Sequence, residues 1–283
     1  MPVTGAIKFF DRSRCLIADG ASATALSGGE SINNILSYDR RNYWRSDVGS
    51  DAVEEEIEIT FSRNSVIDRL LLIDTNLQDI SIAFGGVVQD ITDINNDPVV
   101  LPDMAPPDAP PIYRQNVDTP VIYFEFAPVN LAQITITASK TRIPNEQKYL
   151  RQVIAARELG TFEGFPNVGS YDDSHNEIIN RASTGVKHIT KQIKTLDRFR
   201  ITFRAHPLEN DIALSDRLFD QSDSFTLWPC GGGFGSDHFL FDAKGWQLDD
   251  IYNVQTVGRK SHRWYKNFYK SGINSGLRLL EVI

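Results

Sequence analysis

The sequence has little cysteine, no long hydrophobic run and few stretches of helical periodicity. Its two cysteines, Cys15 and Cys230, lie far apart and in no metal-binding spacing, which argues against a disulfide framework or a zinc site. No apolar stretch approaches the ~18 residues of a membrane span, and residues 1–20 lack the basic and apolar segments of a signal peptide. These absences predict a soluble protein, made in the cytoplasm without a secretion signal and without membrane insertion.

Catalytic motifs are absent as well. There is no Gly-x-Ser-x-Gly elbow, no His-Glu-x-x-His helix and no Gly-x-x-x-x-Gly-Lys phosphate loop, and the five histidines are scattered. Acidic residues are abundant, but a glycosidase pair is defined by its separation in space and not by abundance. We therefore predict that the protein is not an enzyme. A glycosidase or esterase is the weakest alternative, because only the number of carboxylates supports it.

The charge of the chain is negative and unevenly distributed. A net charge of -8 disfavours direct binding to nucleic acid or anionic membrane, because neutralising phosphates needs a positive surface. Residues 1–165 hold 14 Lys/Arg and 23 Asp/Glu, whereas residues 166–283 hold 15 and 14. Together with the length of the chain, this asymmetry predicts two domains, 1–165 and 166–283.

Strand patterns dominate the first half of the chain. Residues 56–61 alternate polar and apolar side chains, the period of a strand with one face in a core. Residues 69–73 form a continuous run, Arg-Leu-Leu-Leu-Ile, which is typical of a strand buried on both faces. Similar β-branched and aromatic alternation occurs at 80–84, 121–126 and 133–137. Short strands without helical crossovers predict a mainly β fold that begins with an antiparallel β-sandwich.

The second half predicts a smaller β-rich domain with one short helix. A segment rich in Gly, Pro, Ser, Asn and Asp at 163–176 marks the boundary before it. Leu214 and Leu218 share one face of a helical pattern at 208–219. Strand patterns occur at 199–204, 225–228, 250–257 and 277–282.

Six prolines in residues 97–111 exclude a central strand there. A long surface loop inserted in the first domain is the favoured interpretation, and an interdomain linker is the alternative. The residues around its start concentrate the hard oxygen ligands that calcium prefers: Asp90, Asp93, Asn95 and Asp97. Pro98 stands where an EF-hand needs glycine, so this motif is excluded. A structural calcium ion and an Asx-rich turn both remain open, and no other cofactor is expected.

The first domain resembles a known family. Asp39, Trp44, Arg45 and Ser46, followed by the strand patterns at 55–61 and 67–72, resemble the galactose-binding-like jelly roll of coagulation-factor type C (discoidin) domains. The resemblance extends to a closing strand within 148–162 and implies a jelly-roll sandwich over residues 1–165. The proline-rich loop and the missing terminal cysteine pair depart from the family pattern.

Tyr43, Trp44 and Arg45 are candidate ligand-binding residues. Aromatic rings beside a guanidinium group suit stacking on a sugar ring and hydrogen bonding to its hydroxyls. Tryptophan buries a large area and more often anchors the core of a sandwich, so a core position for Trp44 is the favoured interpretation and ligand binding is the alternative.

Basic and aromatic residues are interleaved near the end of the chain. Residues 258–283 hold six Lys/Arg and one acid. We predict an interface with an acidic surface, such as that of an adjacent copy, and a surface for single-stranded nucleic acid is the alternative. The candidate interface residues are Arg259, Lys260, Arg263, Trp264, Tyr265, Lys266, Phe268 and Tyr269.

The layout of residues 225–232, 245–252 and 265–272 is similar to the ends of bacteriophage tail and baseplate proteins. This resemblance implies a structural subunit of the virion tail, at the tail tip or baseplate or in a tail-decorating ring. Its partners would be further copies in a homo-oligomeric ring and other tail or baseplate proteins. The alternative is a carbohydrate-binding protein whose jelly-roll loops attach to a host cell-surface glycan.

Overall fold

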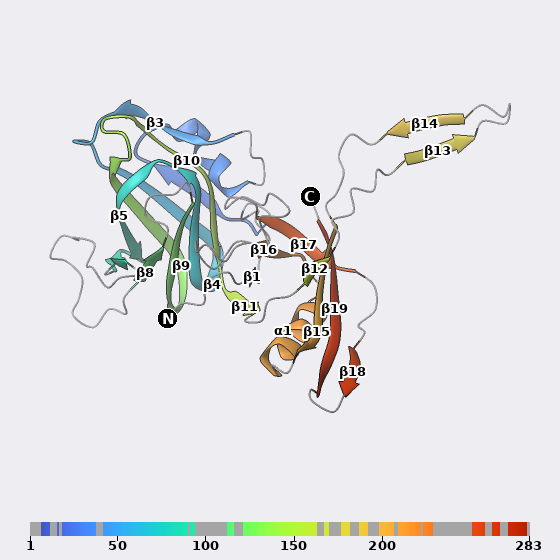
Figure 1. Cartoon of the computed structure of the whole chain (residues 1–283). Helices are drawn as coiled ribbons and strands as arrows, with labels where there is room; N and C mark the ends of the chain where they lie inside the picture. Colours follow the sequence, from blue (N-terminus) through green and yellow to red (C-terminus); the bar gives the residue numbers. More distant parts are fainter. Residues whose placement is uncertain are drawn as a thin grey trace.

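The structure, a computed structural model, confirms the predicted mainly β fold, in which antiparallel sheets dominate (Figure 1). One α-helix, α1 (Glu209–Phe219), and one 3-10 helix, η1 (Gly29–Leu36), occur among the described residues. No helix in that part of the chain is long and apolar enough to cross a membrane. The structure describes residues 7–11, 16, 19–37, 42–89, 91–93, 112–115, 121–162, 167–169, 177–181, 187–191, 198–206, 209–221, 223–228, 251–257, 262–266 and 271–281.

One sheet of nine strands forms the sandwich. Its main path runs in the order β3-β10-β4-β9-β5-β6, with β2 paired to β4 and β8 paired to both β7 and β9. The β7–β8 pair is parallel, and the other strand pairs of this sheet are antiparallel. Its strands are β2 (Ser22–Ala25), β3 (Trp44–Gly49), β4 (Glu55–Thr75), β5 (Leu77–Phe84), β6 (Val87–Val88), β7 (Ile91–Asp93), β8 (Ile112–Gln115), β9 (Val121–Thr141) and β10 (Gln147–Ala156).

The two longest strands, β4 and β9, pair along most of their length and fold over on themselves. Their register shifts between Thr60 and Ser65, where the paired ribbon bends. Ile57 from the first half of β4 and Leu70 from its second half belong to the same core cluster, so the two halves enclose that core. The patterns at 56–61 and 69–73, predicted as separate strands, are thus two parts of one strand.

Both ends of β4 lie at the same end of the sandwich, which we call the loop end. Glu55 at its start pairs with Ala138 of β9, and Leu77, two residues beyond its last residue, pairs with Thr141 of the same strand. The bend in the ribbon lies at the opposite end. This arrangement brings the connections at 50–54, 76 and 142–146 together.

A buried cation closes the loop end. Lys148 is fully buried, and its Nζ donates hydrogen bonds to the backbone O of Ser50 at 2.7 Å and of Val53 at 2.8 Å. Burying an ammonium group is costly unless its hydrogen bonds are made, so these carbonyl groups compensate the lost hydration. Lys148 thereby ties the connection between β3 and β4 to β10.

The predicted strand at 69–73 is buried on both faces, as expected. Leu70 and Leu72 face the sandwich core, whereas Leu71 and Ile73 belong to a cluster on the other side of the sheet. Phe10 and Trp228 from the second sheet, together with Ile251 directly before one of its strands, complete that outer cluster. The outer face of the sandwich is therefore covered, over this area, by the second sheet.

The second sheet of eight strands draws on both halves of the sequence. Its order is β11-β1-β16-β17-β19-β15-β12, with β18 paired to β19, so two strands from residues 1–165 extend it. The division into domains at residue 165 stays a prediction. Its strands are β1 (Ile7–Phe10), β11 (Glu158–Phe162), β12 (Asn167–Gly169), β15 (Arg198–His206), β16 (Phe225–Trp228), β17 (Tyr252–Thr256), β18 (His262–Lys266) and β19 (Ser271–Glu281).

The predicted helix at 208–219 is confirmed as α1, which covers part of this second sheet. Leu214 and Leu218 pack in a core cluster with Phe9 and Phe225 from the strands. A separate hairpin is formed by β13 (Glu177–Arg181) and β14 (Lys187–Lys191), which extends away from both sheets in Figure 1.

Candidate functional site

Trp44, the central residue of the predicted ligand-binding trio, lies in the sandwich core. Its side chain is fully buried, and its Nε1 donates a hydrogen bond to the backbone O of Ser27 at 2.9 Å. Gly28, with φ +63°, permits this approach, because a Cβ there would meet Arg45 O at 2.0 Å and Trp44 Nε1 at 2.9 Å. Trp44 therefore anchors β3, while its neighbours Tyr43 and Arg45 face solvent.

Tyr43 and Arg45 form an ordered surface with Tyr149, a residue that the sequence did not indicate. Arg45 lies opposite Tyr149 in the β3–β10 pair, and its Nη2 donates a hydrogen bond to Tyr43 Oη at 2.8 Å. Arg45 Cζ lies 5.0 Å from the centre of the Tyr43 ring. The rings of Tyr43 and Tyr149 meet edge to face, with centroids 6.2 Å apart. We call these three residues the aromatic surface.

A charged pair lies next to the aromatic surface. Arg151 Nη2 of β10 is 2.6 Å from Asp74 Oδ2 of β4, and both side chains remain partly exposed. Burial raises the pKa of the Tyr149 hydroxyl, and the charge of Asp74 adds to the rise. The hydroxyl therefore stays protonated at neutral pH. The region offers ring faces, a hydroxyl group, guanidinium donors and a carboxylate acceptor within one area.

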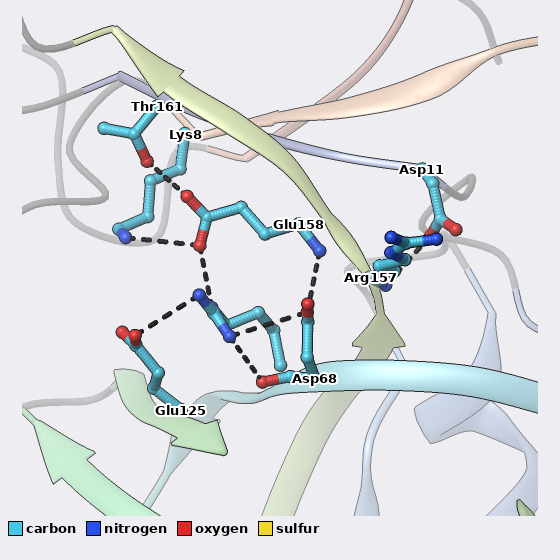
Figure 2. Close-up of polar contacts among 8 residues, drawn as sticks. Lys8, Asp11, Asp68, Glu125, Arg157, Glu158 and Thr161 are labelled. Carbon is cyan, nitrogen blue, oxygen red and sulfur yellow. Dashed lines mark hydrogen bonds and ion pairs between the residues drawn. The ribbon is translucent and has the colours of Figure 1, made fainter. Parts of the chain in front are cut away.

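A second polar group lies where the two sheets meet, and we call it the junction cluster (Figure 2). Its centre is Arg69, whose Nε lies 2.7 Å from Glu158 Oε2. The remaining guanidinium nitrogens reach Asp68 Oδ1 at 3.6 Å and Glu125 Oε1 at 3.3 Å. Two further residues, Lys8 and Thr161, bind Glu158 from the second sheet, with Lys8 Nζ 3.6 Å from Glu158 Oε2 and the Thr161 hydroxyl donating to Oε1.

The junction cluster pairs two cations, Arg69 and Lys8, with three carboxylates, and these pairings favour a structural role. Burial raises the pKa of Asp68, and this outweighs the opposing hydrogen bond from the Glu158 backbone N. Burial also acts to raise the pKa of Glu158, but the charges of Lys8 and Arg69, with hydrogen bonds from Thr161 and Arg69, outweigh it and lower that pKa. Because Arg69 of the sandwich sheet pairs with Glu158 of the second sheet, the cluster joins the two sheets.

The remaining predicted site residues lie largely outside the described residues. Of the predicted calcium ligands, only Asp93 falls in a described strand, β7, and its side chain is not among those described. Within the described part of the chain, no group of three or more His, Cys, Asp or Glu side chains is placed to hold a metal ion. The calcium ion stays a prediction, and so does the proline-rich loop at 97–111.

The predicted interface near the C-terminus also lies partly outside the described residues. Residues 263–266 belong to β18, which pairs with β19, and the other four residues of that prediction lie outside the described part. The tail-subunit role and the ring of copies also stay predictions.

Comparison with known proteins gives similarity to solved structures alone. No protein-family model matches the chain, and no curated protein matches it. A chitosan-binding module from a chitosanase/glucanase of Paenibacillus sp. IK-5 aligns with 12% identity and a TM-score of 0.33, over 51% of this chain and 99% of the module. A Clostridium perfringens protein in complex with GalNAc-β-1,3-galactose aligns with 8% identity and a TM-score of 0.34, over 51% and 99%.

A Ruminococcus gnavus fucosidase in complex with fucose aligns with 13% identity and a TM-score of 0.34, over 53% of this chain. The alignment spans 27% of the fucosidase chain. At these identities and TM-scores the similarities carry no argument about function, which must come from the geometry of the surface itself.

Proposed function

We propose that the protein binds a saccharide on the aromatic surface and catalyses no reaction there. The observation that carries this proposal is the held orientation of Tyr43, which is 36% exposed and is contacted by both Tyr149 and Arg45. A pyranose ring has an apolar face of C–H groups and a rim of hydroxyl groups. It suits a surface that combines aromatic rings with hydrogen-bonding side chains at their edges.

The polar groups around the rings match the needs of sugar hydroxyls. A hydroxyl group both donates and accepts, so it pairs best with a site that offers both kinds of partner. Arg45 and Arg151 supply donors, and Asp74 supplies an acceptor next to Tyr149. Since Arg45 and Asp74 are already held by Tyr43 and Arg151, a ligand meets side chains whose positions are partly set. Such preorganisation lowers the entropy cost of binding.

The test is binding of the full chain to a glycan array, followed by calorimetry with the saccharides that it retains. Tyr43→Ala and Tyr149→Ala are each expected to weaken binding about tenfold or more, because a ring contact is lost. Tyr43→Phe keeps the ring and is expected to retain most of the affinity.

Val87→Ala is a matched control, because Val87 is 47% exposed and lies on β6 at the opposite edge of the sandwich sheet from β3. Thermal melts establish that each variant is folded. Unchanged binding by folded Tyr43→Ala and Tyr149→Ala proteins would contradict the proposal, and so would the retention of no saccharide by the wild-type chain.

A further inference from the structure

Arg142, at the loop end beside the aromatic surface, carries donors without acceptors. Its Nε and Nη2 are shielded from solvent and have no hydrogen-bond partner, whereas the guanidinium nitrogens of Arg69 contact carboxylates. A buried N–H group of a charged side chain costs free energy when it is left unpaired. Such a group is a candidate contact for an acceptor that arrives with a ligand.

The backbone places Arg142 next to Tyr149. Arg142 N donates to the backbone O of Asn76 at 2.9 Å, and Tyr149 N donates to the side-chain Oδ1 of the same asparagine at 2.9 Å. Asn76 Nδ2 also donates to Gln147 O at 2.9 Å, so the buried Asn76 holds β10 through its side chain and the start of the 142–146 connection through its backbone O. The charge of Arg142 acts on the Tyr149 hydroxyl, which is consistent with this placement.

Arg151 offers a second unpaired donor on the same side. Its Nη2 is engaged by Asp74 Oδ2 at 2.6 Å, whereas its Nε is shielded and has no partner. Arg151 lies two residues beyond Tyr149 on β10, and its charge also acts on the Tyr149 hydroxyl. Three unpaired guanidinium nitrogens, from Arg142 and Arg151, therefore lie near the aromatic pair of exposed Tyr43 and half-buried Tyr149.

The local charge is opposite in sign to that of the chain. The chain carries a net charge of -8, yet Arg45, Arg142 and Arg151 surround Tyr149 while Asp74 and Glu146 are the carboxylates whose charges act on it. Guanidinium groups bind planar carboxylates with paired, charge-assisted hydrogen bonds, which are stronger than those to neutral hydroxyl groups. A neutral sugar would leave this capacity unused.

We propose that the ligand of the aromatic surface is an acidic saccharide, whose carboxylate binds Arg142 and the free Nε of Arg151 while its ring packs on Tyr43 and Tyr149. This inference rests on the proposed saccharide-binding function and specifies the class of sugar. The carboxylate of a uronic acid residue is the group that these donors require. A sulfate ester on a neutral sugar presents related oxygens and serves as a comparison in the test.

The experiment is a glycan array that pairs neutral oligosaccharides with their uronic acid counterparts, the methyl esters of those uronic acids and their sulfated forms. Calorimetry on the retained pairs then gives the ratio of affinities. The uronic acid is expected to bind about tenfold or more tightly than its neutral counterpart and its methyl ester. The sulfated form is expected to bind less tightly than the uronic acid. The ratio of uronic acid affinity to neutral affinity is expected to decrease when the salt concentration rises from about 0.05 to 0.5 M.

Arg142→Gln keeps an N–H donor but removes the charge, and it is expected to reduce the ratio of acidic to neutral affinity to about 2 or less. Arg142→Lys restores the charge and is expected to recover part of the ratio. Arg63→Gln is the matched control, since Arg63 is an exposed arginine at the bend of β4, at the other end of the sandwich. This control is expected to leave the ratio at its wild-type value.

The outcomes separate the two proposals. Equal binding of uronic acids, esters and neutral saccharides would overturn the acidic class and leave saccharide binding intact. A ratio that Arg142→Gln does not lower would overturn the role of Arg142. Binding of acetate, a carboxylate without a sugar ring, in the absence of binding to any saccharide would support the carboxylate site and contradict the saccharide function. Absence of all binding would overturn both.

Discussion

Arg69 and Arg142 are two arginines in one sandwich with opposite surroundings. Arg69 lies in the junction cluster, where three carboxylates and one backbone carbonyl face its guanidinium group. Arg142 lies at the loop end, where two of its shielded nitrogens face no acceptor. The difference distinguishes two uses of the same side chain. A guanidinium whose donors are all engaged joins parts of the fold, and one with unpaired donors is a candidate contact for a ligand.

The largest expected effect comes from removing the centre of the junction cluster. Arg69→Met leaves Asp68, Glu125 and Glu158 without their common cation, so we expect unfolding free energy to fall by about 3–5 kcal/mol. Guanidinium chloride denaturation followed by tryptophan fluorescence measures this change. Arg69→Lys supplies a positive charge without the several N–H donors of a guanidinium group. It is expected to recover only part of the lost unfolding free energy. An Arg69→Met protein as stable as the wild type would contradict the structural role of the cluster.

Lys148 at the loop end is buried and, like Arg69, is a cation whose hydrogen bonds are made, so its replacement should also lower the unfolding free energy. Lys148→Met is expected to cost about 2–3 kcal/mol, because the backbone carbonyls of Ser50 and Val53 lose their buried donor. The same denaturation experiment measures it. Lys140→Met is the control, since Lys140 is an exposed lysine paired with exposed Asp79, and its loss is expected to stay within about 1 kcal/mol.

The pH dependence of stability sharpens the comparison within the junction cluster. The folded pKa of Glu158 is lowered, so its stabilisation is present above its ordinary value of 4.5 and is lost as pH falls through the lower, folded pKa. The folded pKa of Asp68 is raised, so its contribution has the opposite sign, and folding gains from Asp68 as pH falls. Glu158→Gln is therefore expected to reduce the loss of stability below pH 4.5, as measured by denaturation at several pH values, whereas Asp68→Asn is expected to steepen it. Equal slopes for both variants would contradict this assignment.

The smallest effect on stability is expected at Arg142, with the opposite sign. Arg142→Met removes two unpaired, shielded donors and keeps an apolar stem, so we expect stability to be unchanged or to rise by up to about 1 kcal/mol. Thermal and chemical denaturation measure this change, and the array measures the accompanying loss of acidic ligands. A loss of stability comparable to that of Arg69→Met would show that Arg142 serves the fold and not a ligand.

The β-structure could be read from local patterns to a large extent. Alternation at 56–61 and the apolar run at 69–73 predicted which side chains are buried, because successive strand residues point to opposite faces. The helix at 208–219 followed from Leu214 and Leu218. The 3-10 helix η1 was missed, since the segment Gly29–Leu36 is short and polar and its apolar residues, Ile32, Ile35 and Leu36, are buried only by tertiary contacts.

The candidate site was predictable only in part. The Tyr43, Trp44 and Arg45 segment was recognised, but the alternation of β3 alone does not say which of its faces points inward. No local sequence pattern indicated that Tyr149, Arg142 and Arg151 contribute to the site. The junction cluster was not predicted either, because Lys8, Arg69 and Glu158 come from three distant segments that meet only when β1 and β11 join the second sheet.

By itself, the sequence determined the class of fold, most of its strands and one helix, because these depend on the spacing of apolar residues over a few positions. Only the tertiary structure decided that Tyr43 meets Tyr149, that Arg69 is fully engaged and that Arg142 is not. These outcomes depend on strand register and on the packing of sheets built from both ends of the chain. Register and sheet packing are set by the combined burial of many residues, so no local pattern encodes them.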